Sequence, residues 1–193
     1  MMTLFPVAPV FPDGFVYVPD FLDNEDERYF LKQIDQIPLH TFVFQGYEAK
    51  RKVASFGYDY SYEKRGLSEG EPIPPAFDRL IKQVSRYLMI DESDFAELLI
   101  TKYPAGSVIN WHRDANPFEL IAGISLLSDC IFRLRPHEKS RQGKGSVVSV
   151  PVSRRSLYVM RGEARMHWQH SISPVKETRY SITLRTLRKH VRL

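Results

Sequence analysis

Three side chains of metal-binding type lie in two short motifs. His112 and Asp114 stand two positions apart in His112-Arg113-Asp114, and His170 lies in Trp168-Gln169-His170-Ser171. Because residues i and i+2 of a β-strand point to the same face, the imidazole and the carboxylate project into one cavity, and His170 is the best candidate for a third ligand. Two histidines and one carboxylate on one face of an ion leave three open positions, as in non-heme Fe(II) oxygenases. The alternative is a pair of polar residues on a surface strand without a metal.

Two arginines near the C-terminal end predict a site for a small dicarboxylate. Arg179 and Arg185 are an even number of positions apart on a predicted strand, so both can face the same interior. Their backbones are about 20 Å apart, and their long side chains can converge on a ligand between them. The planar guanidinium binds a carboxylate with two parallel hydrogen bonds. The alternative is an exposed basic strand, but the apolar Tyr180, Ile182 and Leu184 occupy the other face, as a core strand requires.

The elements that must position these side chains can be predicted from the spacing of apolar and turn residues. Asp23 can cap a helix over residues 24–37. A second helix is expected after Pro74-Pro75, where proline suits the first turn. Between the helices, residues 42–62 are predicted to be extended, with a turn at Gly46.

Beyond residue 98 the pattern changes to short strands that are rich in β-branched and aromatic residues and separated by turn residues. The predicted strands are Leu98–Tyr103, Val108–His112, Leu120–Leu126, Ile131–Arg135, Ser146–Val150, Ser156–Met160 and Arg179–Leu187. Two leading helices followed by about eight short strands predict a mainly β protein of the α+β class, in which helices brace a β-sandwich or jelly roll.

Four aromatic side chains alternate along the extended segment, which would place them on one strand face. They are Phe56, Tyr58, Tyr60 and Tyr62, and Arg51, Lys52, Lys64 and Arg65 bracket them. Aromatic faces stack on nucleobases, and flanking cations hold phosphates. The alternative is that this face packs on the helices as core. Tyr58 and Tyr60 are the best candidates for contact with a substrate.

Composition excludes several classes of protein. Of the 193 residues, 43% are hydrophobic and 26% are charged, which excludes disordered and fibrous chains and fits one domain. No apolar run approaches the roughly 18–20 residues of a membrane helix, so no membrane association is expected. The single cysteine, Cys130, excludes an internal disulfide and a cysteine-built zinc site. Residues 1–10 have no basic residue ahead of an apolar stretch, so a secretory signal is not expected. Together with the single cysteine, this makes the cytoplasm the expected location.

The charges are distributed unevenly along the chain. Residues 1–130 carry 12 Lys and Arg against 20 Asp and Glu, whereas residues 131–193 carry 15 against 3. Such a split indicates a polyanionic partner, or else a basic half that neutralises the acidic half within the fold. One glycine-rich segment holds several of the cations and either tracks phosphates or is a solvated turn. These cations are His137, Lys139, Arg141 and Lys144.

Taken together, these motifs resemble the AlkB family of Fe(II)- and 2-oxoglutarate-dependent dioxygenases, which oxidatively dealkylate nucleobases. The matching motifs span residues 98–187 in the order of the family. They are Lys102-Tyr103-Pro104-Ala105-Gly106, His112-Arg113-Asp114, Gly162-Glu163-Ala164-Arg165, Trp168-Gln169-His170 and Arg179 to Arg185. Residues 49–62 also resemble the nucleotide-recognition lid of the family.

The resemblance implies a role for each matching residue. His112, Asp114 and His170 would bind Fe(II), and Arg179 would pair with the distal carboxylate of 2-oxoglutarate. Further co-substrate contacts are implied for three residues: Arg185 near the metal-chelating end, Tyr103, and Thr101, which replaces an asparagine of many members. Substrate contacts are implied for Tyr58, Tyr60, Trp111, Asn116 and Arg165. Asn116 stands where studied repair members often have an acidic residue.

The resemblance further implies a double-stranded β-helix (jelly roll) with N-terminal helices, within one domain over residues 1–193. Residues 1–95 would form the extension and lid, and residues 96–193 the catalytic core. The implied reaction uses Fe(II), 2-oxoglutarate and O₂ to hydroxylate the alkyl group of a base in single-stranded DNA or RNA, releasing succinate, CO₂ and an aldehyde. The protein is expected to be a monomer. The alternatives are an oxygenase of this fold with a protein or lipid substrate, and a non-catalytic nucleic-acid-binding relative.

Overall fold

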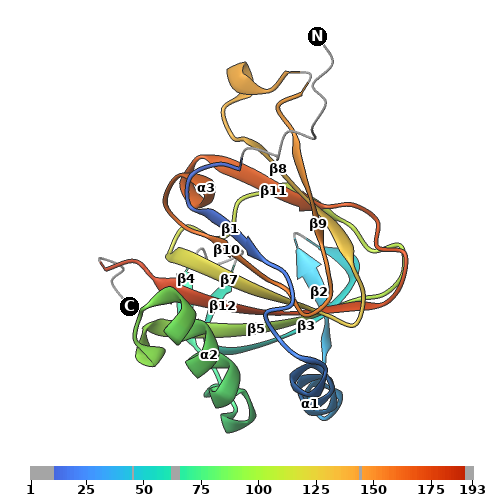
Figure 1. Ribbon diagram of the computed structural model, residues 1–193, viewed down its shortest axis with the longest axis vertical. Coiled ribbons are helices and arrows are strands. Elements are labelled where there is room, and N and C mark those ends of the chain that lie inside the picture. Colours follow the sequence, from blue (N-terminus) through green and yellow to red (C-terminus); the bar gives the residue numbers. More distant parts are fainter. Residues whose placement is uncertain (1–10, 45, 62–65, 144, 190–193) are drawn as a thin grey trace.

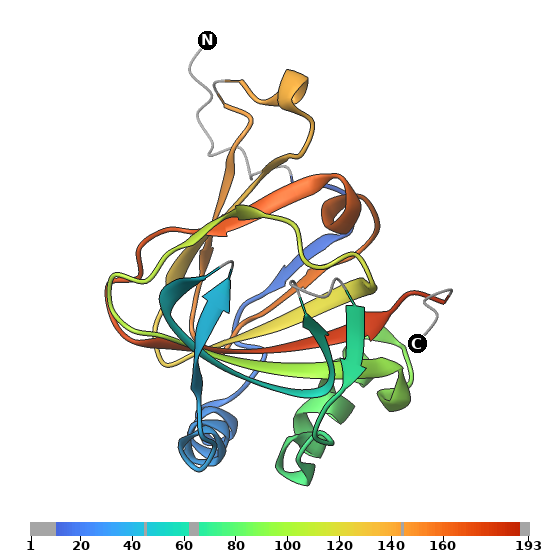
Figure 2. The same ribbon diagram turned by 180° about the vertical axis from the view of Figure 1, so that it is seen from behind.

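Two antiparallel sheets face each other, and two helices cover the outer side of the larger sheet (Figures 1 and 2). The computed structural model describes residues 11–44, 46–61, 66–143 and 145–189. The large sheet has the order β1-β10-β7-β12-β5-β3-β2, with β4 paired to β3, and the small sheet has the order β6-β11-β8-β9. This architecture agrees with the expected jelly roll.

The elements follow one another along the chain with short connections. The helices are α1 (Asn24–Asp35), α2 (Asp78–Leu88) and α3 (Gly162–Met166), with 3₁₀ turns at Pro75–Phe77, Glu92–Asp94 and Lys139–Arg141. The strands are β1 (Phe15–Val18), β2 (His40–Phe44), β3 (Tyr47–Ser61), β4 (Gly66–Glu69), β5 (Phe95–Tyr103), β6 (Ile109–His112), β7 (Phe118–Leu126), β8 (Cys130–Pro136), β9 (Val148–Val152), β10 (Leu157–Met160), β11 (Trp168–Ile172) and β12 (Arg179–Leu187).

The two expected helices form where capping and proline chemistry place them. The Asp23 carboxylate accepts a hydrogen bond from the Asp26 backbone N–H at 2.7 Å, which satisfies a free amide of the first turn of α1. α1 ends at Asp35, two residues earlier than expected. The second helix begins with a 3₁₀ turn at Pro75 before α2 proper.

Separate apolar layers lie on the two sides of the large sheet. On the outer side, residues of α1 and α2 such as Phe30 and Val84 pack on Leu98 and Ile182. On the inner side, Phe132 and its neighbours fill the space between the two sheets. β12 serves both layers because its residues alternate: Ile182 and Leu184 face the helices, while Arg179 and Arg185 face the interior, as predicted.

Four strands or helices were not expected from the sequence. They are β1, β4, β11 and α3, of which α3 begins where a turn was expected at Arg161-Gly162. β11 reads Trp168-Gln169-His170-Ser171-Ile172, with a polar residue on each face, so its sequence lacks the alternation of apolar and polar residues that marks a half-buried strand. Among the described residues, no helix is both long and apolar enough to cross a membrane.

Candidate active site

The three candidate metal ligands come together between the sheets. His112 ends β6, Asp114 follows it, and His170 lies in the middle of β11, directly opposite His112 in the register of the small sheet. One ligand atom from each residue lies within 4.8 Å of the other two. Nδ1 of His112 is 2.8 Å from the Asn110 carbonyl oxygen, so Nδ1 donates a hydrogen and Nε2 is left to bind a metal ion.

The protonation states of the triad suit a divalent cation. Burial is the largest cause that lowers the pKa of His170, His112, Arg165 and Arg185 lower it as well, and Asp114 offsets them only in part, so that this pKa is about 3. Burial would raise the pKa of Asp114, but Arg185 and the two histidines outweigh it and hold that pKa well below its usual range. At neutral pH the site therefore presents a neutral imidazole at His170 and an ionised carboxylate at Asp114.

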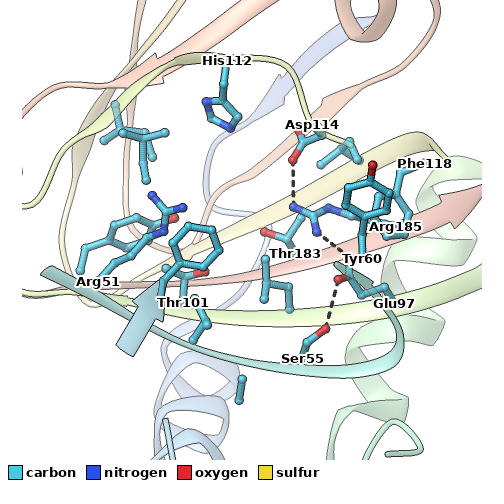
Figure 3. Close-up of a pocket in the computed structure, with 18 of the residues that line it drawn as sticks. Arg51, Ser55, Tyr60, Glu97, Thr101, His112, Asp114, Phe118, Thr183 and Arg185 are labelled. Carbon is cyan, nitrogen blue, oxygen red and sulfur yellow. Dashed lines mark hydrogen bonds and ion pairs between the residues drawn. The ribbon is translucent and has the colours of Figure 1, made fainter. Parts of the chain in front are cut away.

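Arg185 links the triad to the large sheet (Figure 3). Its Nη2 donates to Asp114 Oδ1 at 2.9 Å, and its Nη1 donates to Glu97 Oε2 at 2.5 Å. Ser55 Oγ donates to the other oxygen of Glu97 at 3.1 Å. Charge-assisted bonds of this kind are stronger than neutral ones. The network fixes Asp114 relative to β3, β5 and β12.

Sequence reasoning missed Glu97, although a signal for it existed. Glu97 shares the inward face of β5 with Thr101 and Tyr103, and all three line the cavity. The predicted strand began at Leu98, so Glu97 fell just outside it, whereas β5 begins at Phe95. Extending the period of two by one step would have placed this carboxylate beside the site.

Arg179 is fully buried and incompletely paired. Its Nε donates to Ser125 Oγ at 2.9 Å, and its guanidinium lies 5.0 Å from the Tyr103 ring centroid. Within the described part of the chain, Nη1 and Nη2 of Arg179 have no hydrogen-bond partner. An unsatisfied buried donor costs about 1–3 kcal/mol, more when it is charged, so these two nitrogens suit a carboxylate ligand.

A cavity of about 610 Å³ lies between the triad, Arg185 and Tyr103, whereas Arg179 is not among its lining residues and packs beside the Tyr103 ring. Its walls come from the small sheet, from β5 and β12, and from the hairpin of β2 and β3, where Arg51 lies 3.9 Å from the Phe42 ring centroid. Of the predicted ligand-contacting residues, Thr101, Tyr103 and Tyr60 line this cavity together with the triad and Arg185. Its size fits one small molecule plus a nucleobase-sized group.

Four residues with an implied substrate contact do not line the cavity. Tyr58 lies half-buried where β3 pairs with β4, and Asn116 is exposed beyond Asp114. Trp111 lies on the opposite face of β6 from His112, because neighbouring strand residues alternate. Arg165 is buried behind the loop that carries Asp114, which we call the metal loop.

The expectation that alternating aromatics share one strand face is wrong. Phe56 packs in the helix-side core, whereas Tyr60 lines the cavity. Gly57 lies between them with φ +81°, where a Cβ would come within 2.2 Å of the Ala96 carbonyl oxygen. This backbone conformation shifts the alternation as β3 leaves β5 and pairs with β4. Tyr62, Lys64 and Arg65 lie outside the described residues.

Arg165 supports the metal loop from behind. Its Nη2 donates to the backbone carbonyl oxygens of Asp114 at 3.2 Å and Ala115 at 2.6 Å. Arg113, between the two ligands of the loop, donates to the Met166 carbonyl oxygen at 2.7 Å. These three bonds tie α3 to the loop that carries Asp114, so Arg165 positions a metal ligand and does not line the cavity.

Comparison with known proteins places these features in a family. Residues 14–192 match the family model described as 2OG-Fe(II) oxygenase superfamily. A Xenopus tropicalis protein, tRNA (carboxymethyluridine(34)-5-O)-methyltransferase alkbh8, is 32% identical over 177 residues, which cover 88% of this chain and 27% of that protein. An Arabidopsis thaliana protein, Alkylated DNA repair protein ALKBH8 homolog, is 26% identical over 211 residues, covering 92% of this chain and 59% of the relative.

A solved structure shares the fold. "The structure of OsALKBH1" superposes with a TM-score of 0.72 at 15% sequence identity and covers 94% of this chain and 100% of the other. These matches confirm the resemblance to the AlkB family and the jelly roll predicted from the sequence. The chain spans about a quarter of the length of the vertebrate relatives it matches.

Removal of the carboxylate ligand tests the metal centre. We expect Asp114→Ala to lower the affinity for Fe(II) or Mn(II) by more than about 100-fold, since losing a direct ligand exceeds the effect of losing a supporting residue. The fold is expected to persist because Arg185 keeps Glu97 as a partner. Metal titration with thermal unfolding measures both, and Asp35→Ala, an exposed carboxylate on α1, is the control. Wild-type metal affinity in Asp114→Ala would show that the triad is misassigned.

Loss of the support behind the loop should also weaken metal binding. Arg165→Met keeps the bulk of the side chain but leaves the Asp114 and Ala115 carbonyl oxygens unpaired, so we expect about tenfold weaker Mn(II) binding. Arg165→Lys should restore part of the affinity, and exposed Arg161→Met is the matched control. Equal metal affinity in folded Arg165→Met and wild-type protein would contradict a positioning role.

Proposed function

The chain belongs to the 2OG-Fe(II) oxygenase superfamily, and we propose that it removes alkyl groups oxidatively from nucleobases in single-stranded DNA or RNA. Its cofactor and co-substrates are Fe(II), 2-oxoglutarate and O₂. The observation that carries the proposal is the position of the His112, Asp114 and His170 triad. It lies in a cavity that also reaches Tyr103, and beside Tyr103 lies Arg179, whose Nη1 and Nη2 have no hydrogen-bond partner among the described residues.

The triad fits Fe(II) by its chemistry. Two imidazoles and one carboxylate are the ligand set that leaves open positions on this ion, and Asp114 is ionised at neutral pH. Bound Fe(II), with 2-oxoglutarate and O₂, supplies an oxidant able to hydroxylate a C–H bond. The chain's own part is to hold the reactants in place and to exclude water.

The two interior arginines would orient 2-oxoglutarate. Arg179 offers Nη1 and Nη2 to the distal carboxylate, and the buried hydroxyl of Tyr103 lies beside it, 3.4 Å from Ser181 Oγ. We call Arg179 and Arg185 together the clamp. Arg185 bonds Asp114 at the end of the clamp that lies near the metal ligands. Thr101 faces the same cavity as Tyr103, so its hydroxyl can take the place of the longer asparagine of other members.

The size and lining of the cavity support a single extruded base as substrate. A volume of about 610 Å³ cannot hold a paired base, so the target must be flipped out or single-stranded. Phe42 and Arg51 line the cavity on the side of the β2–β3 hairpin, and Tyr60 lines it at the other end of β3, beside Arg185 (Figure 3). These side chains provide ring and cation surfaces for a base and its phosphate. Hydroxylation of an N-alkyl carbon gives a hemiaminal, whose N–C bond then breaks to release an aldehyde and leave the dealkylated base in the strand.

The names of similar proteins also favour a nucleic acid. One relative is called a tRNA methyltransferase and another an alkylated DNA repair protein. The decisive experiment measures succinate and formaldehyde release with methylated single-stranded DNA, RNA and tRNA, beside unmodified strands. We expect both products in equal amounts from at least one methylated strand. Succinate without formaldehyde from every strand, but with product from a peptide or lipid, would reject the proposal.

Replacing the clamp arginine tests its role. Arg179→Lys keeps the positive charge but cannot donate two parallel hydrogen bonds, so we expect the KM for 2-oxoglutarate to rise at least about tenfold. Mn(II) affinity should stay unchanged, because Arg179 contacts none of the triad residues. Arg86→Lys, on the exposed side of α2, is the control. An unchanged KM for 2-oxoglutarate would exclude Arg179 from the clamp.

Salt dependence tests the basic loop between β8 and β9. Lys139 and Arg141 are exposed, and Lys144 lies outside the described residues. If the loop follows a nucleic-acid backbone, each phosphate contact adds about −0.7 to the slope of log affinity against log salt for a single strand. Replacing all three by Gln should flatten the slope by about 2 while succinate release without nucleic acid is kept. Unchanged affinity and slope would make the loop a solvated turn.

A further inference from the structure

The outward face of the small sheet carries a cluster that the proposed reaction does not use. The guanidinium carbons of Arg133 and Arg135 lie 5.0 and 4.3 Å from the ring centroid of Trp111. We call these three residues the outer-sheet platform. Figure 1 shows β8, β9 and β11 of this sheet on the side of the molecule away from α1 and α2.

Strand register places the platform on the face opposite the metal site. His170 pairs with Leu134, and both point into the interior. Their neighbours Gln169 and Ser171 pair with Arg135 and Arg133, so these residues point outward. Trp111 precedes His112 and points outward for the same reason.

Each arginine of the platform is held in a fixed orientation with its outer nitrogens available. Arg133 donates from Nε to Ser171 Oγ at 3.0 Å, and Arg135 donates from Nε to Gln169 Oε1 at 2.8 Å. Within the described parts of the chain, neither arginine bonds an acceptor through Nη1 or Nη2. A guanidinium anchored through Nε keeps its terminal pair of N–H groups for an incoming phosphate or carboxylate.

The charge of the platform is not neutralised on its own sheet. The sequences of β6, β8, β9 and β11 contain no acidic residue. Cation–π contact with an aromatic ring orients a guanidinium without cancelling its charge. The platform therefore presents two fixed positive charges beside an aromatic surface, which complements a polyanion with ring-bearing units.

The platform also lies next to the rim of the catalytic cavity. β6 is the edge strand of the small sheet, and β2 is the edge strand of the large sheet. Both edge strands line the cavity, β6 through His112 and β2 through Phe42. A strand that leaves the cavity across β6 meets Trp111 first and then reaches β8, about 10 Å further, two strand spacings away.

We propose that the outer-sheet platform binds the sugar–phosphate backbone of the nucleic acid that flanks the target nucleotide. This inference rests on the proposed function, because it assumes that the target base enters the cavity. Arg133 and Arg135 would each bind a phosphate end-on, and Trp111 holds both guanidinium groups in place. The platform extends recognition beyond the single base that the cavity can hold.

Binding of an unmodified single-stranded 15-mer tests the surface without any turnover. We expect Arg133→Gln/Arg135→Gln to weaken binding and to flatten the slope of log affinity against log salt by about 1.4, for two phosphate contacts. Lys82→Gln/Arg86→Gln removes two exposed charges from α2 and is expected to keep the wild-type slope. The same slope in all three proteins overturns the proposal, as does equally good competition by polyglutamate.

Conservative variants separate a docking role from a structural one. Trp111→Phe keeps an aromatic face and should retain most of the affinity, whereas Trp111→Leu should weaken binding about two- to fivefold. Thermal unfolding of each variant identifies a folding defect, and Arg133→Lys/Arg135→Lys, which keeps the charges, should keep most of the salt slope. Loss of the slope in the lysine variant would overturn the assignment of the phosphates to these two side chains.

Substrate length distinguishes this proposal from the proposed function. The ratio of kcat/KM for a methylated 15-mer to that for a methylated trinucleotide should fall severalfold in Arg133→Gln/Arg135→Gln and not in the α2 control. An unchanged ratio overturns the platform as part of substrate recognition. Platform-dependent binding by a wild-type protein that releases no formaldehyde would overturn dealkylation and leave the docking surface standing.

Discussion

The Arg185 guanidinium bonds two buried carboxylates at once, and the geometry of the site depends on this pairing. Asp114 lies on the small-sheet side, Glu97 on the large sheet, and Arg185 spans the space between them. In a low-dielectric interior, either carboxylate alone would favour its protonated form. With Arg185 between them, Asp114 stays ionised and fixed in direction, which a metal ligand requires. The two sheets are therefore connected electrostatically at the point where the chemistry takes place.

The buried arginines differ in how completely they are hydrogen-bonded, and the arginine with free donors indicates where a ligand binds. Arg165 donates to backbone carbonyl oxygens and Arg185 to carboxylates, whereas Arg179 keeps two donors without a partner among the described residues. Natural interiors rarely leave a buried charge half satisfied, because desolvation is costly. A dianionic ligand that reaches Arg179 would accept hydrogen bonds from these two donors and remove this cost. The donors that destabilise the ligand-free protein therefore strengthen ligand binding.

The sequence alone could predict that Arg179 and Arg185 face the same side of β12, because they are an even number of residues apart on one strand. Asp114 lies beyond the end of β6 and His170 lies on another strand, so the sequence could only nominate the triad, and the pairing of β6 with β11 brings it together. The role of Arg165 could not be predicted, because its partners are backbone carbonyl oxygens, which leave no trace in residue types. The aromatic face failed at Gly57, whose left-handed conformation breaks the alternation of β3, so that Asp59 and Tyr60 both line the cavity while Phe56 packs in the helix-side core.

The uneven charge of the chain has two structural explanations, and each accounts for part of it. Some C-terminal arginines neutralise N-terminal acids within the fold: Arg154 and Arg155 bind Glu27 and Asp20. Arg165, Arg179 and Arg185 are used inside, around the site. Four further cations, Arg133, Arg135, Lys139 and Arg141, lie on β8 and the loop that follows it, whereas Arg161, Lys176 and Lys189 are exposed elsewhere. Since none of these four forms an ion pair among the described residues, part of the basic excess of the C-terminal half lies on the sheet that carries two of the metal ligands, where a polyanionic substrate would be held beside the cavity.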